Sequence, residues 1–119
     1  MVKKNNLIQD KTFNFSLMTI ELYKKLIAKK EFVISKQLLR SGTSIGANVD
    51  EALAGQTKKD FIAKMAIASK ESRETSYWLR LLQASNIVNL SYEKCLSKIN
   101  EIINILTAIV KTSQSKIYS

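Results

Sequence analysis

The chain has 119 residues, a length typical of one domain built around one hydrophobic core. Apolar residues make up 45% and charged residues 24%, a balance that excludes a wholly disordered chain. Nineteen Lys and Arg against ten Asp and Glu give a net charge of +9, which favours polyanionic partners. With no Pro and only three Gly, the sequence favours long helices over many short strands.

The residue inventory argues against the common enzyme mechanisms. The sequence has no His, so the usual general base, imidazole metal ligands and His-containing triads are unavailable. It also has neither a GxGxxG run nor a Walker-type phosphate loop. We therefore expect a protein that is not an enzyme, with no catalytic residues, no metal site and no cofactor.

Cysteine usage and hydropathy indicate where the protein is found. The single cysteine, Cys95, cannot form an intramolecular disulfide, which fits a reducing compartment. The first residues lack the apolar segment of an export signal, and no apolar run approaches the ~20 residues that span a bilayer. We therefore expect a cytoplasmic protein that does not contact a membrane.

Apolar residues at helical spacing predict four amphipathic helices. They cover about residues 13–30, 36–54, 58–85 and 92–112, after a flexible basic segment over residues 1–11. Ser35 is predicted to cap the second helix, and Thr57 with Asp60 to open the third in a capping-box-like arrangement. Long helices joined by short turns pack most simply as an antiparallel up-and-down four-helix bundle, so residues 1–119 are predicted to form one all-α domain.

The third and fourth predicted helices carry more apolar residues than one core stripe needs. The extra residues are Ile67, Trp78 and Leu81 on the third helix and Ile102, Ile105 and Ile109 on the fourth. Such a surplus either widens the core of the bundle or forms the contact with a partner subunit.

The second predicted helix contains an unusual run, Ser-Gly-Thr-Ser-Ile-Gly-Ala-Asn, over residues 41–48. Gly42 and Gly46 lie one helical turn apart on the same face, which favours close approach of a neighbouring helix. The hydroxyls of this run would then bond back to helix carbonyls. The alternative is a break near Gly42 that exposes backbone amides to an anion.

Carboxylates are dense enough in only two places to suggest acid–base or two-metal chemistry, namely Asp50 with Glu51 and Glu71 with Glu74. A carboxylate site in a helical bundle normally includes a Glu-x-x-His pair, and this chain has no His. Structural ion pairs are therefore favoured, with partners drawn from Arg40, Lys70, Arg73 and Arg80.

The basic excess supplies the candidate binding residues. Residues 1–40 alone hold nine basic and three acidic residues. Clustering along the chain selects six candidates for contact with nucleic acid: Lys24, Lys25, Lys29, Lys58, Lys59 and Lys64. The alternative is a lysine-rich solvated surface without a ligand. Tyr77 and Trp78 could stack on unpaired bases, but an aromatic pair on an apolar helix face is more often part of a core or a subunit interface.

Two runs carry a resemblance to a known family. SIGANVDE over residues 44–51 and ESRETSYWL over residues 71–79 closely resemble the four-helix-bundle proteins encoded in intervening sequences of bacterial 23S rRNA. The similarity covers residues 13–110. The positions that match the family signature are Ser44, Asn48, Glu51, Glu71, Glu74 and Trp78, which we interpret as structural.

The resemblance implies a homopentameric, barrel-like assembly without established enzymatic activity. It also implies kinship with the accessory variability proteins of diversity-generating retroelements, which are basic pentamers associated with reverse transcriptase and nucleic acid. Together with the charge, it leads us to expect a non-enzymatic homo-oligomer that binds RNA or DNA backbone through its basic surface. The alternative is a protein–protein scaffold, or an accessory subunit of a nucleic-acid enzyme, without direct nucleic-acid contact.

Overall fold

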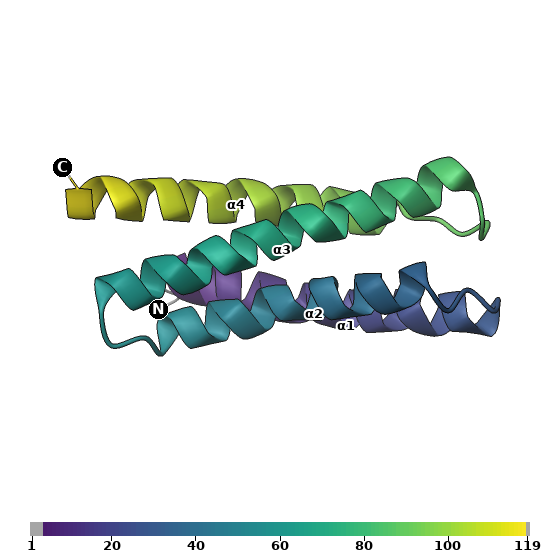
Figure 1. Cartoon of the computed structure of the whole chain (residues 1–119), viewed down its shortest axis with the longest axis horizontal. Helices are drawn as coiled ribbons and strands as arrows, with labels where there is room; N and C mark the ends of the chain where they lie inside the picture. Colours follow the sequence, from purple (N-terminus) through teal and green to yellow (C-terminus); the bar gives the residue numbers. More distant parts are fainter. Residues whose placement is uncertain (1–3, 119) are drawn as a thin grey trace.

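The computed structural model describes residues 4–118, which form four helices. Their bounds are α1 Lys4–Ala28, α2 Ile34–Leu53, α3 Lys58–Ser85 and α4 Glu93–Tyr118. Each helix turns back alongside the one before it, and α1 and α3 each pack against both α2 and α4 (Figure 1). The result is an antiparallel up-and-down bundle of 48 × 25 × 22 Å, which confirms the predicted fold class.

The first and last helices are longer than predicted. Residues 4–11 belong to α1, so the prediction of a flexible segment over residues 1–11 was wrong for them; residues 1–3 lie outside the described residues. Ile8 explains the difference, because its fully buried side chain anchors the first turns of α1 to the core. At the other end of the chain, α4 continues past residue 112 to Tyr118.

The predicted helix starts gave mixed results. Thr57 accepts a hydrogen bond from the Asp60 backbone N–H at 3.1 Å, so the predicted start of α3 is confirmed. Ser35, by contrast, lies inside α2 and does not cap it. Its place is taken by the carboxylate of Glu31, which accepts hydrogen bonds from the first backbone N–H groups of the helix.

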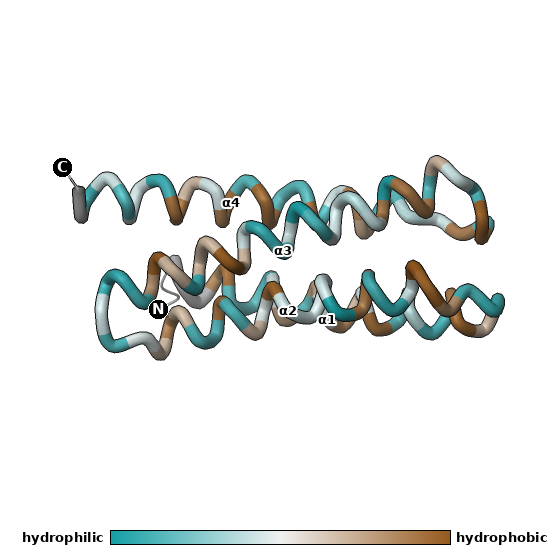
Figure 2. The backbone as a smooth tube through the Cα atoms, viewed as in Figure 1, coloured by the Kyte–Doolittle hydropathy of each residue, from teal (hydrophilic) through white to brown (hydrophobic). Residues whose placement is uncertain are grey.

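The core is built from buried apolar residues of all four helices, and apolar residues recur along each helix (Figure 2). On α1 the buried positions alternate in steps of four and three, from Ile8 through Phe15 and Leu22 to Leu26, with Thr12 and Thr19 between them. Both Thr hydroxyls donate to the carbonyl four residues earlier, at 2.9 Å. These hydrogen bonds allow two polar side chains to occupy core positions.

The glycines of α2 permit close contact with α1. A Cβ atom at Gly42 would lie 2.6 Å from Cγ2 of Thr19, and one at Gly46 would lie 3.3 Å from the backbone oxygen of Thr12. The packing interpretation is therefore confirmed. Helix α2 runs unbroken through both glycines, so the alternative of an anion-binding break near Gly42 was wrong.

The exposed apolar surface differs in part from the one predicted: Ile67 of α3 is 39% exposed as expected, but the surplus residues of α4 are covered. Ile102 is only 2% exposed, and Ile105 and Ile109 pack against the core, so the surplus stripe of α4 widens the core. Helix α1 instead presents three large apolar side chains to solvent at helical spacing. They are Phe13, Leu17 and Ile20, with exposures of 63%, 49% and 37%. We call these three residues the α1 apolar face.

Candidate functional site

Arg40 of α2 joins the two carboxylates of α3 that had been considered for catalysis. Its guanidinium lies 3.4 Å from Glu71 and also pairs with Glu74. The Glu74 carboxylate accepts a further hydrogen bond from the indole N–H of Trp78 at 2.9 Å. The expected ion pairs with Arg40 are therefore confirmed, and this cluster holds α2 against α3 on one side of the bundle.

The remaining signature residues also make contacts within the bundle. The side-chain amide of Asn48 donates to the backbone oxygen of Ser44 at 2.9 Å and to its hydroxyl at 3.1 Å. Glu51 of α2 pairs with Lys64 of α3 at 3.3 Å. Across residues 4–118, His, Cys, Asp and Glu form no group of three that could hold a metal ion. Contacts at all six signature positions thus fit a structural role.

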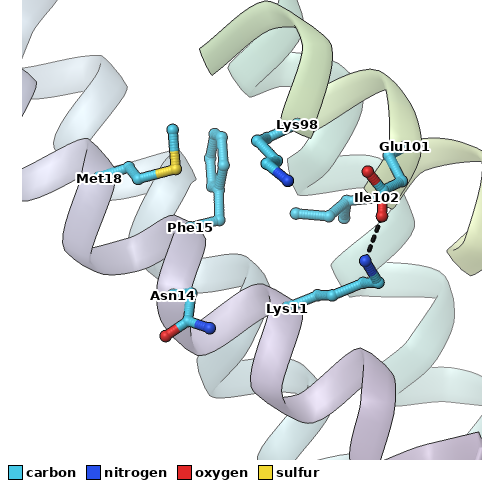
Figure 3. A pocket seen from close by; sticks show the side chains of 7 residues that line it. All are labelled: Lys11, Asn14, Phe15, Met18, Lys98, Glu101 and Ile102. Carbon is cyan, nitrogen blue, oxygen red and sulfur yellow. Dashed lines mark hydrogen bonds and ion pairs between the residues drawn. The ribbon is translucent and has the colours of Figure 1, made fainter. Parts of the chain in front are cut away.

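A small pocket lies between α1 and α4 (Figure 3). Its volume is about 150 Å³, and Phe15 and Ile102 form its apolar wall. The Lys11 ammonium bridges to the Glu101 carboxylate at its side, and this hydrogen bond lowers the pKa of Glu101. The one carboxylate that lines the pocket, Glu101, is paired with Lys11. We therefore interpret the pocket as a gap between two packed helices and not as an acid–base site.

The six candidate lysines do not form one surface. Lys24, Lys25 and Lys29 lie at the end of α1, whereas Lys58, Lys59 and Lys64 lie at the start of α3. Since the helices alternate in direction, these two groups lie at opposite ends of the bundle (Figure 1). We call the end that holds the α1–α2 turn, residues 29–33, and the α3–α4 turn, residues 86–92, the twin-turn end.

The two lysine groups differ in the acidic residues around them. Residues 24–36 contain five Lys and one acidic residue, Glu31. Residues 50–64, which surround the α2–α3 turn, contain three Lys and three acidic residues, and Lys64 is paired with Glu51. Lys24 is also paired, with Glu21 at 3.1 Å, but both side chains are well exposed and screened by water. Unbalanced positive charge is therefore greater around the α1–α2 turn than around the α2–α3 turn.

Glu31, the one acidic residue of that segment, is turned inward and is 8% exposed. Its carboxylate accepts hydrogen bonds from the backbone N–H groups of Val33, Ile34 and Ser35 at 3.2, 3.1 and 2.6 Å. Burial on its own raises the pKa of Glu31, but these backbone hydrogen bonds outweigh it and hold the pKa below its usual value. The Glu31 carboxylate is thus hydrogen-bonded inside the turn, and the charged side chains of residues 24–36 that are exposed to solvent are lysines.

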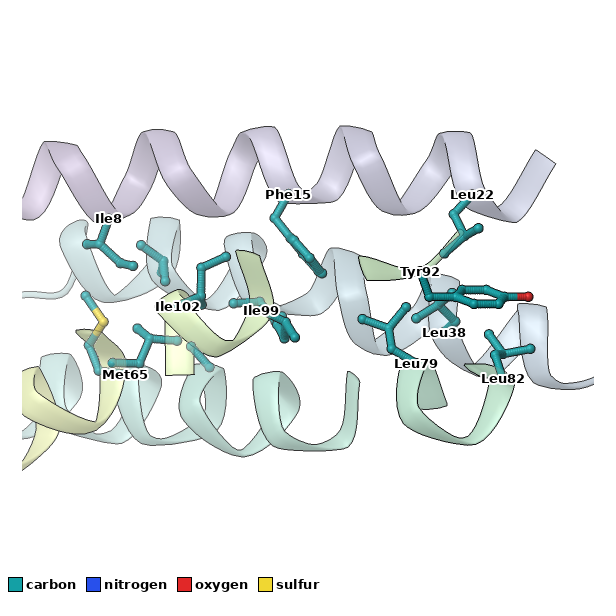
Figure 4. Close-up of a cluster of buried hydrophobic side chains, with 14 of the residues drawn as sticks. Ile8, Phe15, Leu22, Leu38, Met65, Leu79, Leu82, Tyr92, Ile99 and Ile102 are labelled. Carbon is teal, nitrogen blue, oxygen red and sulfur yellow. The ribbon is translucent and has the colours of Figure 1, made fainter. Parts of the chain in front are cut away.

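The α3–α4 turn is fastened to the same end of the core. Tyr92 is buried near Leu38 and Leu82, and its hydroxyl donates to the Val88 backbone oxygen at 2.8 Å (Figure 4). The turn leads into α4, whose Lys94 lines a surface groove together with Lys25 of α1. The twin-turn end therefore collects lysines from separate helices.

Cys95 lines the groove that Lys25 and Lys94 border. Burial raises the pKa of its thiol, and the two ammonium groups only partly oppose that rise. The thiol therefore stays protonated at neutral pH and is a poor nucleophile.

Tyr77 and Trp78 form an edge-to-face pair on α3, with ring centroids 5.1 Å apart. The Arg80 guanidinium lies over the Tyr77 ring at 5.9 Å from its centroid. Trp78 is held by its hydrogen bond to Glu74, so these rings already have partners within the bundle.

Sequence reasoning missed several features of the twin-turn end. Lys30, Lys36 and Lys94 were outside the candidate set, and the inward position of Glu31 was not foreseen. The signal was present in the run Lys-Lys-Glu-Phe-Val over residues 29–33, which places one acidic residue between basic and apolar ones.

Comparison with known proteins identifies the relatives of this bundle. The family model described as "23S rRNA-intervening sequence protein" matches residues 4–108. The chain belongs to this family. Among curated proteins, no significant match was found for this 23S rRNA-intervening sequence family member.

A crystal structure supports both the family and the fold. It is described as a protein with unknown function from the S23 ribosomal protein family of Bacteroides thetaiotaomicron VPI-5482. The two chains are 47% identical and superpose with a TM-score of 0.86 over 92% of this chain and 99% of the other. The resemblance found in the two sequence runs is thus confirmed over most of the bundle.

Proposed function

We propose that this family member is a non-enzymatic homo-oligomer that binds the phosphodiester backbone of RNA or DNA through its twin-turn end. The observation that carries the proposal is the charge of residues 24–36, where five Lys surround one Glu whose carboxylate is buried. A phosphate approaching this end meets ammonium groups without an exposed carboxylate from the same segment. Lys25 and Lys94 extend the basic surface from α1 to α4.

The chemistry of the basic residues favours the backbone over the bases as the ligand. Sixteen of the nineteen basic residues are Lys, whose ammonium is a flexible point charge. Specific base reading in a duplex usually relies on bidentate Arg, and this chain has only three Arg. One of them, Arg40, is already paired with two carboxylates of α3. Binding that depends little on sequence and strongly on salt is expected.

Self-association multiplies this charge. The α1 apolar face lies on the outside of the bundle, and burying it removes apolar surface from water. Five copies, the number that the family resemblance implies, would multiply the net charge of +9 fivefold. Weak contacts at each subunit then add up through their linkage in one particle.

The experiment compares two triple variants that remove equal charge from opposite ends of the bundle. Fluorescence anisotropy measures their binding to a short mixed-sequence duplex at low salt. The variants are K24Q/K25Q/K29Q and K58Q/K59Q/K64Q. The first is expected to lose at least about 10-fold in affinity, because contacts to phosphate are removed, and the second much less. Equal losses, or no binding of the unaltered protein at low salt, would contradict the proposal.

A further inference from the structure

The twin-turn end also exposes three large apolar side chains. The exposed fraction of the side chain is 60% for Phe32, 74% for Val33 and 59% for Ile87. All three residues lie in turns and not in helices. Phe32 and Val33 come from the α1–α2 turn, and Ile87 from the α3–α4 turn at the same end (Figure 1). Phe32 is the aromatic member of the group and directly follows the buried Glu31.

The backbone on both sides of Phe32 is fixed. The Glu31 N–H donates to the Leu26 oxygen at 3.0 Å, and the Val33 N–H donates to the Glu31 carboxylate at 3.2 Å. The Ser35 hydroxyl donates to the Glu31 backbone oxygen, which ties the turn to α2. A short turn held in this way presents the Phe32 ring outward at little further loss of conformational entropy on binding.

The lysines that flank Phe32 in the sequence indicate which kind of ligand its ring would contact. Lys29, Lys30 and Lys36 belong to the same turn and the adjoining turn of α2, and all three are exposed. Lys30 adopts a left-handed backbone conformation with φ 65°, which ends α1 and directs the chain into the turn. An exposed aromatic ring next to ammonium groups is the combination that binds single-stranded nucleic acid, in which base faces are free and phosphates lie nearby.

We propose that Phe32 stacks on an unpaired base while the neighbouring lysines hold the adjacent phosphates, so that the twin-turn end prefers single-stranded RNA or DNA to a duplex. This inference rests on the proposed function and adds the class of nucleic acid. A duplex can contact the same lysines, but its base faces are covered by their neighbours in the stack. Phe32 therefore contributes to single-strand binding alone.

The test measures binding of the unaltered protein, F32A and F32L to a mixed-sequence single strand and to the duplex of the same sequence, as RNA and as DNA. F32A is expected to weaken single-strand binding by about 5- to 150-fold, the range for losing one base–aromatic contact. F32L, which keeps apolar bulk without an aromatic ring, is expected to lose nearly as much. Duplex binding should change less than about 2-fold in both variants.

The controls separate this inference from the proposed function. If the unaltered protein bound neither the single strand nor the duplex at low salt, the proposed function itself would be wrong. Duplex binding that persists without a single-strand preference, or a single-strand preference that F32L retains, would overturn only the role of Phe32.

Vesicles containing phosphatidylglycerol test the other possibility, that the exposed apolar side chains of the turn insert into lipid. If they retain the unaltered protein and F32L but not F32A, the turn inserts into lipid and the inference is wrong. Circular dichroism checks that each variant is folded.

Discussion

Glu31 shows how one side chain can shape both a turn and the surface around it. Its carboxylate replaces the predicted Ser35 cap and satisfies the first amides of α2. Hydrogen bonds to a charged acceptor contribute more to the free energy of unfolding than hydrogen bonds between neutral groups do. We predict that Glu31→Gln lowers the free energy of unfolding by about 1–3 kcal/mol at neutral pH, measured by urea denaturation.

The same residue gives the protein an acid-sensitive element. The pKa of Glu31 is lower in the folded protein than in the unfolded chain, so its contribution to stability is fully present above the unfolded pKa of about 4.3. That contribution is lost as the pH falls through the folded pKa. The stability difference between the unaltered protein and Glu31→Gln is therefore expected to shrink when the urea series is repeated near pH 3. A constant difference would contradict this role.

Gly42 is required by the side chain opposite it. A Cβ at this position would lie 2.6 Å from Cγ2 and 2.7 Å from the hydroxyl of the buried Thr19. Ala normally stabilises a helix by about 1 kcal/mol relative to Gly, but overpacking outweighs that gain. We predict that Gly42→Ala is destabilised by about 1–3 kcal/mol in thermal or urea unfolding.

The companion variant Thr19→Ala tests the cause. It removes the two atoms closest to the new Cβ and leaves the Thr19 Cβ at 3.1 Å, so the double variant G42A/T19A should recover part of the stability lost in Gly42→Ala. If the two substitutions prove additive, the contact with Thr19 is not the reason for glycine at position 42.

At the scale of single residues, the sequence predicts contacts that are local and misses those that depend on folding back. Thr57 and Asp60 are three residues apart, and their capping geometry follows from that spacing. Glu31 is as close in sequence to the amides it accepts from, but the left-handed backbone of Lys30 sets where α2 begins, and this was not foreseen from the sequence. Arg40 and Glu74 are far apart in sequence, so their pairing was open until α2 and α3 were placed side by side.

At the scale of elements, α1 was the hardest helix to interpret. Its buried seam contains Thr12 and Thr19, and polar residues at those positions conceal the heptad spacing that begins at Ile8. The apolar residues that stand out in the sequence, such as Phe13 and Leu17, point away from the core. When a helix has apolar residues on two faces, the sequence does not show which face is buried until the neighbouring helices are placed.

The outward face of α1 is expected to mediate self-association. We predict that Leu17→Glu, which places a charge within the α1 apolar face, reduces the assembly to single subunits in light scattering. Its helix content should not change, because Leu17 is 49% exposed within the bundle.

Ile67→Glu provides the matched control. Ile67 is 39% exposed but lies on α3, so the same change of residue there should leave the assembly intact. An oligomer that survives Leu17→Glu and dissociates with Ile67→Glu would assign the interface to α3 instead of α1.

At the scale of the whole molecule, the distribution of charge follows from topology. The six candidate lysines were selected by clustering in the sequence, which cannot show that alternating helix directions separate them into two ends. The fold places Asp50, Glu51 and Asp60 near the lysines of the α2–α3 turn, while the one carboxylate of residues 24–36, Glu31, is buried in the α1–α2 turn. Among residues 4–118, no helix has an apolar stretch of the length needed to cross a bilayer.

In the proposed function, an assembly of several subunits presents its lysines together to nucleic acid. The most direct test is the salt dependence of binding to duplex DNA, compared between the unaltered protein and Leu17→Glu. The five lysines of residues 24–36 and Lys94 in one subunit limit the slope of log K against log salt to about −5.4. We predict a steeper slope for the unaltered protein and a slope within that limit for the variant. Identical slopes for the two proteins, or no binding at low salt, would contradict it.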